Sequence, residues 1–362
     1  MAGRRVFAVV LILVGLVLLA NNLGLVTWSL RDAFRVLWPL ILVLFGVSLI
    51  LEGTGAGAGA GWFAGIVLLL VAGAAVAVRA GWIPEGRLWG VSEARTKSFQ
   101  VPAGAYHPQA VRLHVSLGSS RVTIAEKEEP GFLSTQATYY LPEDEPRLSQ
   151  AMSGETLVLD YAEKGGRAFG IRFASHQARH EIQLQDSGVA TDILVDLGSG
   201  DGTVELGRTN LRELRLDIGS GTLSCRATEP LAEASEVFTC EVGSGSLEVT
   251  RLGDLKPREV DVKVGSGSGR VNLDGEWVPG VVDVRLEVGS GKLEVVIPAG
   301  AGFAITGRTG SGALYVNGVR RQGRRVDYSE RFDVAPVRLR IIADVGSGEL
   351  RVWALQTGRV EV

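Results

Sequence analysis

Apolar and polar residues alternate along most of the second half of the chain, and the tripeptide Gly-Ser-Gly repeatedly interrupts the alternation. Before Gly219, for example, Leu214, Leu216 and Ile218 alternate with charged residues, and Leu223 resumes the alternation after the tripeptide. A period of two places successive side chains on opposite faces of a β-strand. Each repeat is therefore expected to contain a strand, a sharp corner and a second strand, with one face of both strands buried.

Seven copies of the tripeptide recur at steps of 21 to 36 residues. Repeats of this length are typical of folds in which each unit buries its apolar face only against its neighbours. A sharp corner needs positive φ or a close backbone approach, and glycine permits both. The serine could hydrogen-bond from one corner to the next. We assign the first glycines of the copies as structural turns: Gly198, Gly219, Gly243, Gly265, Gly289, Gly310 and Gly346.

An eighth, degenerate copy, Gly118-Ser119-Ser120, extends the pattern toward the N-terminus. The interpretation is an all-β domain, either a β-solenoid or a stack of strand pairs, with Gly-Ser-Gly corners. An open sandwich is the alternative, because alternation identifies strands but not their pairing. We place the first part of this domain at residues 105–185, the repeat array at 186–356 and a short tail at 357–362.

Three apolar runs, at residues 6–20, 36–51 and 61–78, precede the β domain. A membrane-spanning helix needs about 20 apolar residues, and tryptophans beside these runs suit the membrane interface. We therefore expect about three transmembrane helices in residues 1–82, followed by a linker at 83–104. This predicts a multi-pass cell-membrane protein, with the lipid bilayer as a partner.

The sequence gives conflicting signals about the orientation of the membrane segment. Arg4 and Arg5 precede the first apolar run, which favours a cytoplasmic N-terminus, and three spans then place the β domain outside the cytoplasm. The count of basic residues around the later runs favours the reverse orientation. We favour an extracytoplasmic β domain, and demoting one span to an interfacial helix would reverse that choice.

Charge and composition argue against nucleic acid as a partner. The chain has 362 residues, 48 of them glycine, and a formal net charge of −3. The basic residues do not gather into a stripe along the β domain, which is mildly acidic, whereas nucleic-acid binding depends on clustered Lys and Arg.

Histidine and cysteine offer few candidate sites. His176 and His180 have a metal-ligand spacing if helical, but they adjoin alternating strand sequence, so we interpret them as solvated loop or edge residues. Cys225 and Cys240 share the inward phase of neighbouring repeats. They are interpreted as buried thiols, and a disulfide is the alternative in an oxidising compartment.

An acidic residue stands two positions before five of the corners. A column of acids could bind calcium, but the match to known calcium repeats is poor, and Lys263 and Arg308 occupy the same position in the other two units. We therefore predict a solvated outer face, with a nest of corner amides for anions as a lesser alternative. The five acids are Asp196, Asp217, Glu241, Glu287 and Asp344.

Motifs for nucleophilic catalysis, phosphate binding or paired carboxylates were sought and did not emerge. We accordingly assign no catalytic, cofactor-binding or metal residues and do not expect an enzyme.

Two short motifs resemble a known bacterial membrane region. The stretch Asn21-Asn22-Leu23-Gly24-Leu25, followed by Leu37-Trp38-Pro39-Leu40, is similar to the LiaI/LiaF-like transmembrane region. The region from Lys97 to Glu126 and the Gly-Ser-Gly units that follow resemble toast-rack and putative-adhesin β domains. The resemblance implies a membrane regulator or sensor of cell-envelope stress, with a membrane histidine kinase or another envelope protein as partner.

A second interpretation treats the helices as an anchor only. The β domain would then be a surface-exposed adhesive or structural module of the envelope. In either case the variable return loops, including the long segment 317–334, are the expected places for partner contact.

Overall fold

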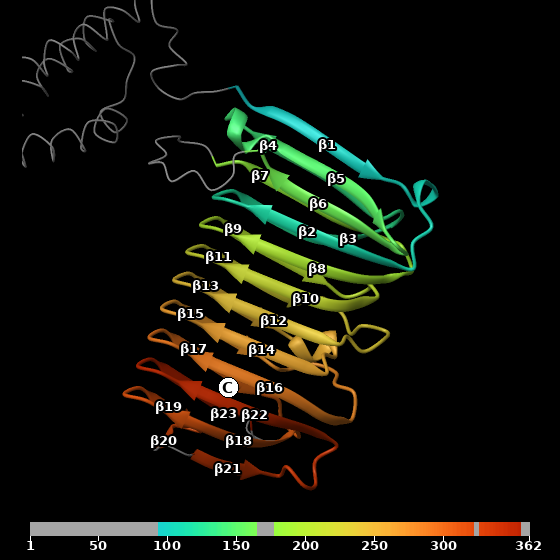
Figure 1. Cartoon of the computed structure of the whole chain (residues 1–362). Helices are drawn as coiled ribbons and strands as arrows, with labels where there is room; N and C mark the ends of the chain where they lie inside the picture. Colours follow the sequence, from blue (N-terminus) through green and yellow to red (C-terminus); the bar gives the residue numbers. More distant parts are fainter. Residues whose placement is uncertain (1–92, 165–176, 322–325, 356–362) are drawn as a thin grey trace, which may run out of the picture. The chain divides into compact units, whose positions relative to one another are not determined.

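The computed structural model describes residues 93–164, 177–321 and 326–355. The chain divides into two compact units, Met1–Trp89 and Gly90–Val362. The three apolar runs assigned to membrane spans lie in the first unit, outside the described residues, as does the predicted tail 357–362. The described residues of the second unit form the β domain of Figure 1.

Two sheets, which we call sheet A and sheet B, contain the described strands, and neighbours in the following lists are hydrogen-bonded. Sheet A has the order β1 (Arg95–Val101), β4 (Leu133–Tyr139), β7 (Arg179–Asp186), β3 (Arg121–Pro130), β9 (Asp201–Leu206), β11 (Thr222–Ala227), β13 (Ser246–Thr250), β15 (Ser268–Asn272), β17 (Lys292–Ile297), β23 (Glu349–Ala354), β19 (Ala313–Val316) and β20 (Val319–Arg321). Sheet B has the order β21 (Val326–Glu330), β18 (Gly302–Thr309), β22 (Val337–Val345), β16 (Gly280–Val288), β14 (Glu259–Val264), β12 (Val237–Val242), β10 (Leu211–Ile218), β8 (Ala190–Leu197), β2 (Ala110–Leu117), β6 (Thr156–Glu163) and β5 (Pro146–Ser153). In the described part of the chain, three short 3-10 helices lie between strands: η1 (Ala103–Ala105), η2 (Pro142–Asp144) and η3 (Leu252–Leu255).

The two strands of each repeat lie in different sheets, so that neighbours within a sheet belong to neighbouring repeats. β10 of sheet B leads through the corner at Gly219 into β11 of sheet A, and a return loop leads back to β12 of sheet B. We call each such strand–corner–strand unit a rung. In Figure 1 the rungs lie one below another with their corners along one edge. The predicted all-β, solenoid-like stack of strand pairs is confirmed.

Parallel pairing in register builds the core from columns of equivalent side chains. On sheet B, Leu216 pairs with Val195 on one side and with Cys240 on the other. On sheet A, Cys225 lies between Val204 and Val249 in the same way. All six side chains are at most 1% exposed. Burying an aliphatic side chain contributes roughly 1.5–3 kcal/mol, so each added rung stabilises its neighbours mainly by extending these columns.

Antiparallel strands close both ends of the stack. At one end β1 pairs with β4 and β5 pairs with β6, and at the other end β20 pairs with β19 and β21 pairs with β18. β1 lies within residues 83–104, the segment interpreted as a linker, and β20 and β21 lie within 317–334, which was expected to be a loop. The loop interpretation of 317–334 is wrong, because its strands extend the final rung of each sheet.

The rungs do not follow one another in sequence order at the C-terminal end. The last rung of the chain, β22 and β23, lies between the Gly289 rung (β16 and β17) and the Gly310 rung (β18 and β19). Gly346 accordingly donates its N–H to Val288, and Gly310 donates to Val345. The chain therefore forms the outer Gly310 rung first and then returns to place the Gly346 rung beside the Gly289 rung. This return accounts for the 36-residue step between the last two corners.

Candidate functional site

The seven predicted turn glycines lie where the chain passes from sheet B to sheet A. Each corner donates backbone N–H groups to carbonyls of the neighbouring corner. Gly219 donates to Leu197 (N···O 2.8 Å) and Ser220 donates to Gly198 (2.7 Å), and corresponding bonds link the later corners. The degenerate corner at Gly118 belongs to the same ladder, because Ser199 donates to its carbonyl (2.7 Å). Most of the corner N–H groups thus donate to carbonyls of the fold, which argues against an open anion nest.

Close approach, rather than positive φ, explains why these positions are glycine. The corner glycines are not among the glycines with positive φ in the described residues. A Cβ built on Gly219 would lie 2.6 Å from the Gly198 oxygen, and one built on Gly289 would lie 2.8 Å from the Gly265 oxygen. Between the corner glycines, the Oγ atoms of Ser266 and Ser290 lie 3.1 Å apart, as the proposed serine contact requires.

The acids before the corners form part of a charged outer face. Lys263 pairs with Glu241 (3.2 Å), and the Nε atom of Arg308 donates to Asp344 (2.8 Å), so the two basic exceptions neutralise acids of the same column. Burial raises the pKa of Asp217 above its ordinary value, although the neighbouring Arg215 guanidinium acts to lower it. Among the described residues, no cluster of three or more His, Cys, Asp or Glu side chains has a geometry suited to a metal ion.

His180 is fully buried, which makes the prediction of a solvated residue wrong. His176 lies outside the described residues. The Nδ1 atom of His180 lies 2.8 Å from the Tyr161 hydroxyl, and its Nε2 atom lies 3.3 Å from Glu163. His180 and Ile182 are two residues apart in β7, so both lie on its buried face. This alternation was the sequence signal that His180 is buried.

Glu163 completes the buried network beside the first corner. It accepts hydrogen bonds from the Gly118 N–H (2.9 Å) and the Ser120 hydroxyl. Burial alone would raise the pKa of Glu163, but hydrogen bonds from His180, Ser120 and Gly118 outweigh it, so the pKa lies below its ordinary value. The carboxylate therefore supplies the first corner with the acceptor that a neighbouring corner supplies elsewhere in the ladder.

Both cysteines are buried free thiols, Cys225 in β11 of sheet A and Cys240 in β12 of sheet B, the next strand along the chain. Burial raises the pKa of Cys225 to about 12, and burial together with the neighbouring Cys225 thiol raises the pKa of Cys240 well above its ordinary value. These positions therefore contribute to packing in the structure.

A groove opens in sheet A on the side of the return loops, and sequence reasoning did not anticipate it. β3 pairs with β9 only as far as Ile124 and Val204. Beyond that point β3 continues alongside β7, in regular register to Lys127 and after an irregularity to Pro130, while β9 continues alongside β11 to Leu206. Between the separated strand ends lies a cavity of about 880 Å³, which is within the usual size range of ligand sites.

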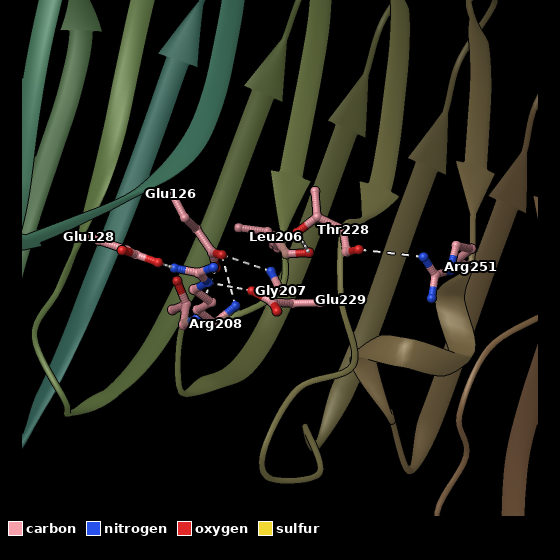
Figure 2. Close-up of polar contacts among 9 residues, drawn as sticks. Glu126, Glu128, Leu206, Gly207, Arg208, Thr228, Glu229 and Arg251 are labelled. Atoms are coloured by element: carbon pink, nitrogen blue, oxygen red, sulfur yellow. Dashed lines mark hydrogen bonds and ion pairs between the residues drawn. The ribbon is translucent and has the colours of Figure 1, made fainter.

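Side chains bridge the groove where the backbone ladder stops (Figure 2). Glu126, two residues beyond the last pair between β3 and β9, accepts hydrogen bonds from three successive backbone N–H groups in the β9–β10 loop: Gly207 (2.9 Å), Arg208 (2.8 Å) and Thr209 (2.8 Å). The Arg208 guanidinium contacts Glu128 on one side and Glu229 on the other.

The groove is acidic and lies beside an unpaired buried acceptor. Its lining includes five glutamates and two basic residues, a net charge of −3. Gln185, which also lines it, is 6% exposed, and its Oε1 atom has no hydrogen-bond partner among the described residues. The only sequence signal was the charged run from Glu126 to Glu129, which ends at Pro130.

Comparison with known families now adds to this geometry. Residues 5–50 match the LiaI-LiaF-like transmembrane region, and residues 92–250 match the N-terminal domain of toast_rack, DUF2154. The chain therefore matches, in succession, a LiaI-LiaF-like transmembrane region and the N-terminal domain of toast_rack. All the residues that line the groove fall within the matched toast-rack range, whereas the rungs from Gly265 onward continue the stack beyond it.

Solved structures similar to this chain include three from bacteria. A putative cell adhesion protein from Clostridium sporogenes is 15% identical, with 73% of this chain and 100% of that chain covered and a TM-score of 0.39. A putative adhesin from Parabacteroides distasonis is 15% identical (73% and 98% covered, TM-score 0.35), and a putative lipid binding protein from the same species is 13% identical (72% and 96%, TM-score 0.36). No curated protein sequence matches the chain. A helix long and apolar enough to cross a membrane is not found within the described residues.

Proposed function

We propose that this protein is a non-enzymatic, membrane-anchored regulator or sensor in a bacterial cell-envelope stress response. The observation that carries the proposal is the presence of a LiaI-LiaF-like transmembrane region and a toast-rack domain in one chain. Such an arrangement couples a membrane segment to a rigid domain with a large surface. The partner would be a membrane histidine kinase or another envelope protein that contacts the membrane segment.

A structural role for the repeats supports the non-enzymatic part of this proposal. Most N–H groups of the corners donate hydrogen bonds to backbone carbonyls of the neighbouring rungs. The buried thiols have raised pKa values, so they are protonated and poorly nucleophilic at neutral pH. His180 is held inside the core by Tyr161 and Glu163. The groups that most often perform catalysis are thus used to hold the fold.

We further propose three transmembrane spans and an extracytoplasmic β domain. Ser244, in an exposed corner, provides a reporter for that topology. With Cys225 and Cys240 replaced by alanine, a Ser244→Cys variant in whole cells should react with a membrane-impermeant maleimide. Labelling only after the cells are permeabilised would place the β domain in the cytoplasm and refute this part of the proposal.

The regulatory role is tested by deleting the gene and measuring an envelope-stress promoter under cell-wall antibiotics. The promoter response should change in the deletion strain and return when the intact chain is restored. A second complementation replaces residues 1–82 with an unrelated anchor of the same topology, and it should not restore the response, because the native membrane segment contacts the partner. An unchanged promoter in the deletion strain, together with lost surface attachment, would instead favour the adhesive or structural module.

A further inference from the structure

We propose that two copies of this chain join at the N-terminal end of the stack, with β1 of each copy pairing beside β5 of the other. The partner is thus a second copy, related to the first by a two-fold axis parallel to the strands. The proposed regulatory function does not specify an assembly, and the observations that indicate this one all come from the described β domain.

The two sheets end at different levels at this end of the stack. Beyond the rung of β2 and β3, sheet A adds β7, β4 and β1, whereas sheet B adds only β6 and β5. Sheet A therefore extends one strand further, and β1 lies at the top of the stack in Figure 1. No described strand fills the position beside β5 in sheet B. A second copy fills it with its own β1, while its β5 lies beside β1 of the first copy.

The directions of the strands select the axis. β1 and β7 are both antiparallel to β4, and β7 is parallel to β3, which begins at a corner. β5 is antiparallel to β6, which is parallel to β2, and β2 ends at that corner. Both β1 and β5 therefore begin at the corner edge. A two-fold axis along the strands preserves this direction, so the new pairs are parallel, as in the regular rungs.

A two-fold axis perpendicular to the sheets is excluded by the overhang of β1. Such an axis would pair β5 with its own copy and would place β1 of each copy where β4 of the other lies. The axis along the strands has no such overlap. It also places both copies of Arg95, where β1 begins, on the same side of the assembly, which suits two chains anchored in one membrane.

The free edge of β5 is open to pairing. The strand is eight residues long, and Arg147 is its only charged residue, whereas edge strands are usually protected by shortness or charge. A two-residue turn with Gly154 at φ 62° joins β5 to β6, so Ser153 and Thr156 form a hydrogen-bonded pair. Alternate residues then direct their backbone N–H and C=O groups away from β6. These residues are Leu148, Gln150 and Met152.

The inner faces of β5 and β1 carry apolar side chains that the stack leaves partly uncovered. Leu148 pairs with Tyr161 and Met152 pairs with Leu157, and both partners in β6 are fully buried. Leu148 is nevertheless only half-buried, and Met152 is 43% exposed. Phe99 of β1 is half-buried too, with its ring 6.3 Å from that of Tyr161. In the assembly, Phe99 of the second copy lies beside Leu148, so the core continues from one copy into the other.

Charges at the joint are complementary. The Lys97 Nζ atom lies 2.8 Å from Glu145, and the two side chains are 35% and 29% exposed. Because the axis runs between the two copies of β1, both ion pairs meet at the corner edge, and each cation has an anion of either copy as a neighbour. Neither copy brings an uncompensated charge to the inner face, so pairing does not require an unpaired charge to be buried.

Disulfide cross-linking of the full chain in detergent micelles tests the pairing directly. With Phe99 beside Leu148, Gln100 of one copy lies beside Ser149 of the other, and both side chains are exposed. Within one chain these residues lie on the outer faces of opposite sheets, so Gln100→Cys with Ser149→Cys can form a disulfide only between chains. With Cys225 and Cys240 replaced by alanine, mild oxidation should give a covalent dimer.

The matched control joins Gln100→Cys to Ser329→Cys, because Ser329 is exposed in β21 at the other end of sheet B. This pair should stay monomeric on a non-reducing gel. Equal cross-linking of the control pair would indicate head-to-tail stacking, and failure of the Gln100 and Ser149 pair to cross-link would mean that β1 does not lie beside β5. Either result would overturn the proposal.

Sedimentation of the full chain in the same detergent measures the strength of the assembly. Met152→Lys should raise the dissociation constant of the dimer about tenfold or more, because each copy then brings an ammonium group to the inner face, and the two-fold axis doubles the effect. Met152→Leu should leave it unchanged. Val319→Lys is the control at the opposite end, where Val319 of β20 is 53% exposed.

A monomeric chain, or a dimer that Met152→Lys and Val319→Lys affect equally, would contradict assembly through β1 and β5. The latter result would be expected if the chains associated only through their membrane segments. None of these measurements uses promoter activity, so the assembly and the regulatory function can fail separately.

Discussion

The second glycine of each Gly-Ser-Gly corner is subject to a steric limit that Gly291→Ala tests. A Cβ built at Gly291 would collide with the carbonyl oxygen of Gly267, and it would lie 2.9 Å from the carbonyl carbon of Ser266 and 3.0 Å from the nitrogen of Gly267. Because non-bonded carbon contacts are normally about 3.5–4.0 Å, the corner must move by roughly 0.5–1 Å. That movement disturbs the bonds from Gly291 to Gly265 (2.9 Å) and from Lys292 to Gly267 (3.0 Å). At about 1 kcal/mol per bond and about 1–3 kcal/mol for overpacking, we expect a loss of roughly 3–5 kcal/mol.

Two other glycines provide a graded control for this substitution. Gly289→Ala, whose Cβ would lie 2.8 Å from one carbonyl oxygen, should cost about 1–3 kcal/mol. Gly104→Ala should change stability by less than about 0.5 kcal/mol, because no atom lies within 4 Å of its Cβ position. Urea unfolding of the full chain in nanodiscs, followed by far-UV circular dichroism, gives the free energies, and hydrogen exchange of β16 and β17 localises the effect. If Gly291→Ala and Gly104→Ala were equally stable, close approach would not be the reason for the corner glycines.

Three further predictions concern buried side chains. Glu163→Gln should lower stability by about 1–3 kcal/mol at neutral pH. Because the pKa of Glu163 is lowered in the folded state, the carboxylate stabilises the fold at pH values above its ordinary pKa of 4.5, and this stabilisation is lost as the pH falls through the folded-state pKa. The melting temperature of the Glu163→Gln variant should therefore fall less steeply at acid pH than that of the native chain. An equally steep fall in both proteins would contradict this. Cys225 and Cys240 should react with iodoacetamide at about pH 8 only after unfolding, and rapid labelling of the native chain would disprove their burial. Phe238→Ala should cost about 3–5 kcal/mol in urea unfolding because the ring is 1% exposed, whereas a loss below about 1 kcal/mol would place it outside the core.

The buried faces and the corners were predictable because both are encoded locally. Alternation alone placed Leu216 and Cys240 on the inward face, and they occupy one column of the core. The recurrence of Gly-Ser-Gly marked where two strands meet. Neither feature depends on knowing which rung lies next to which.

The neighbour relationships were not predictable from alternation. Nothing in the local pattern indicates that the Gly346 rung lies between those of Gly289 and Gly310, because all three present the same apolar phase. The separation of β3 from β9 is likewise a property of pairing, so the groove could not be located from its glutamates alone. His180 differs from these cases, because its inward phase was visible in the sequence and was outweighed by the expectation that histidine is solvated.

Departures from the repeat distinguish this β domain from a uniform scaffold. In the regular rungs, backbone groups of one corner satisfy those of the next, and such a ladder cannot be exchanged for a ligand without unfolding the rung. Glu163 and Glu126 replace missing ladder contacts with a carboxylate, at the first corner and across the split between β3 and β9 respectively. A side-chain contact can be titrated or displaced while the backbone stays in place. The irregular rungs, rather than the repeated tripeptide, are therefore where the domain can respond to its surroundings.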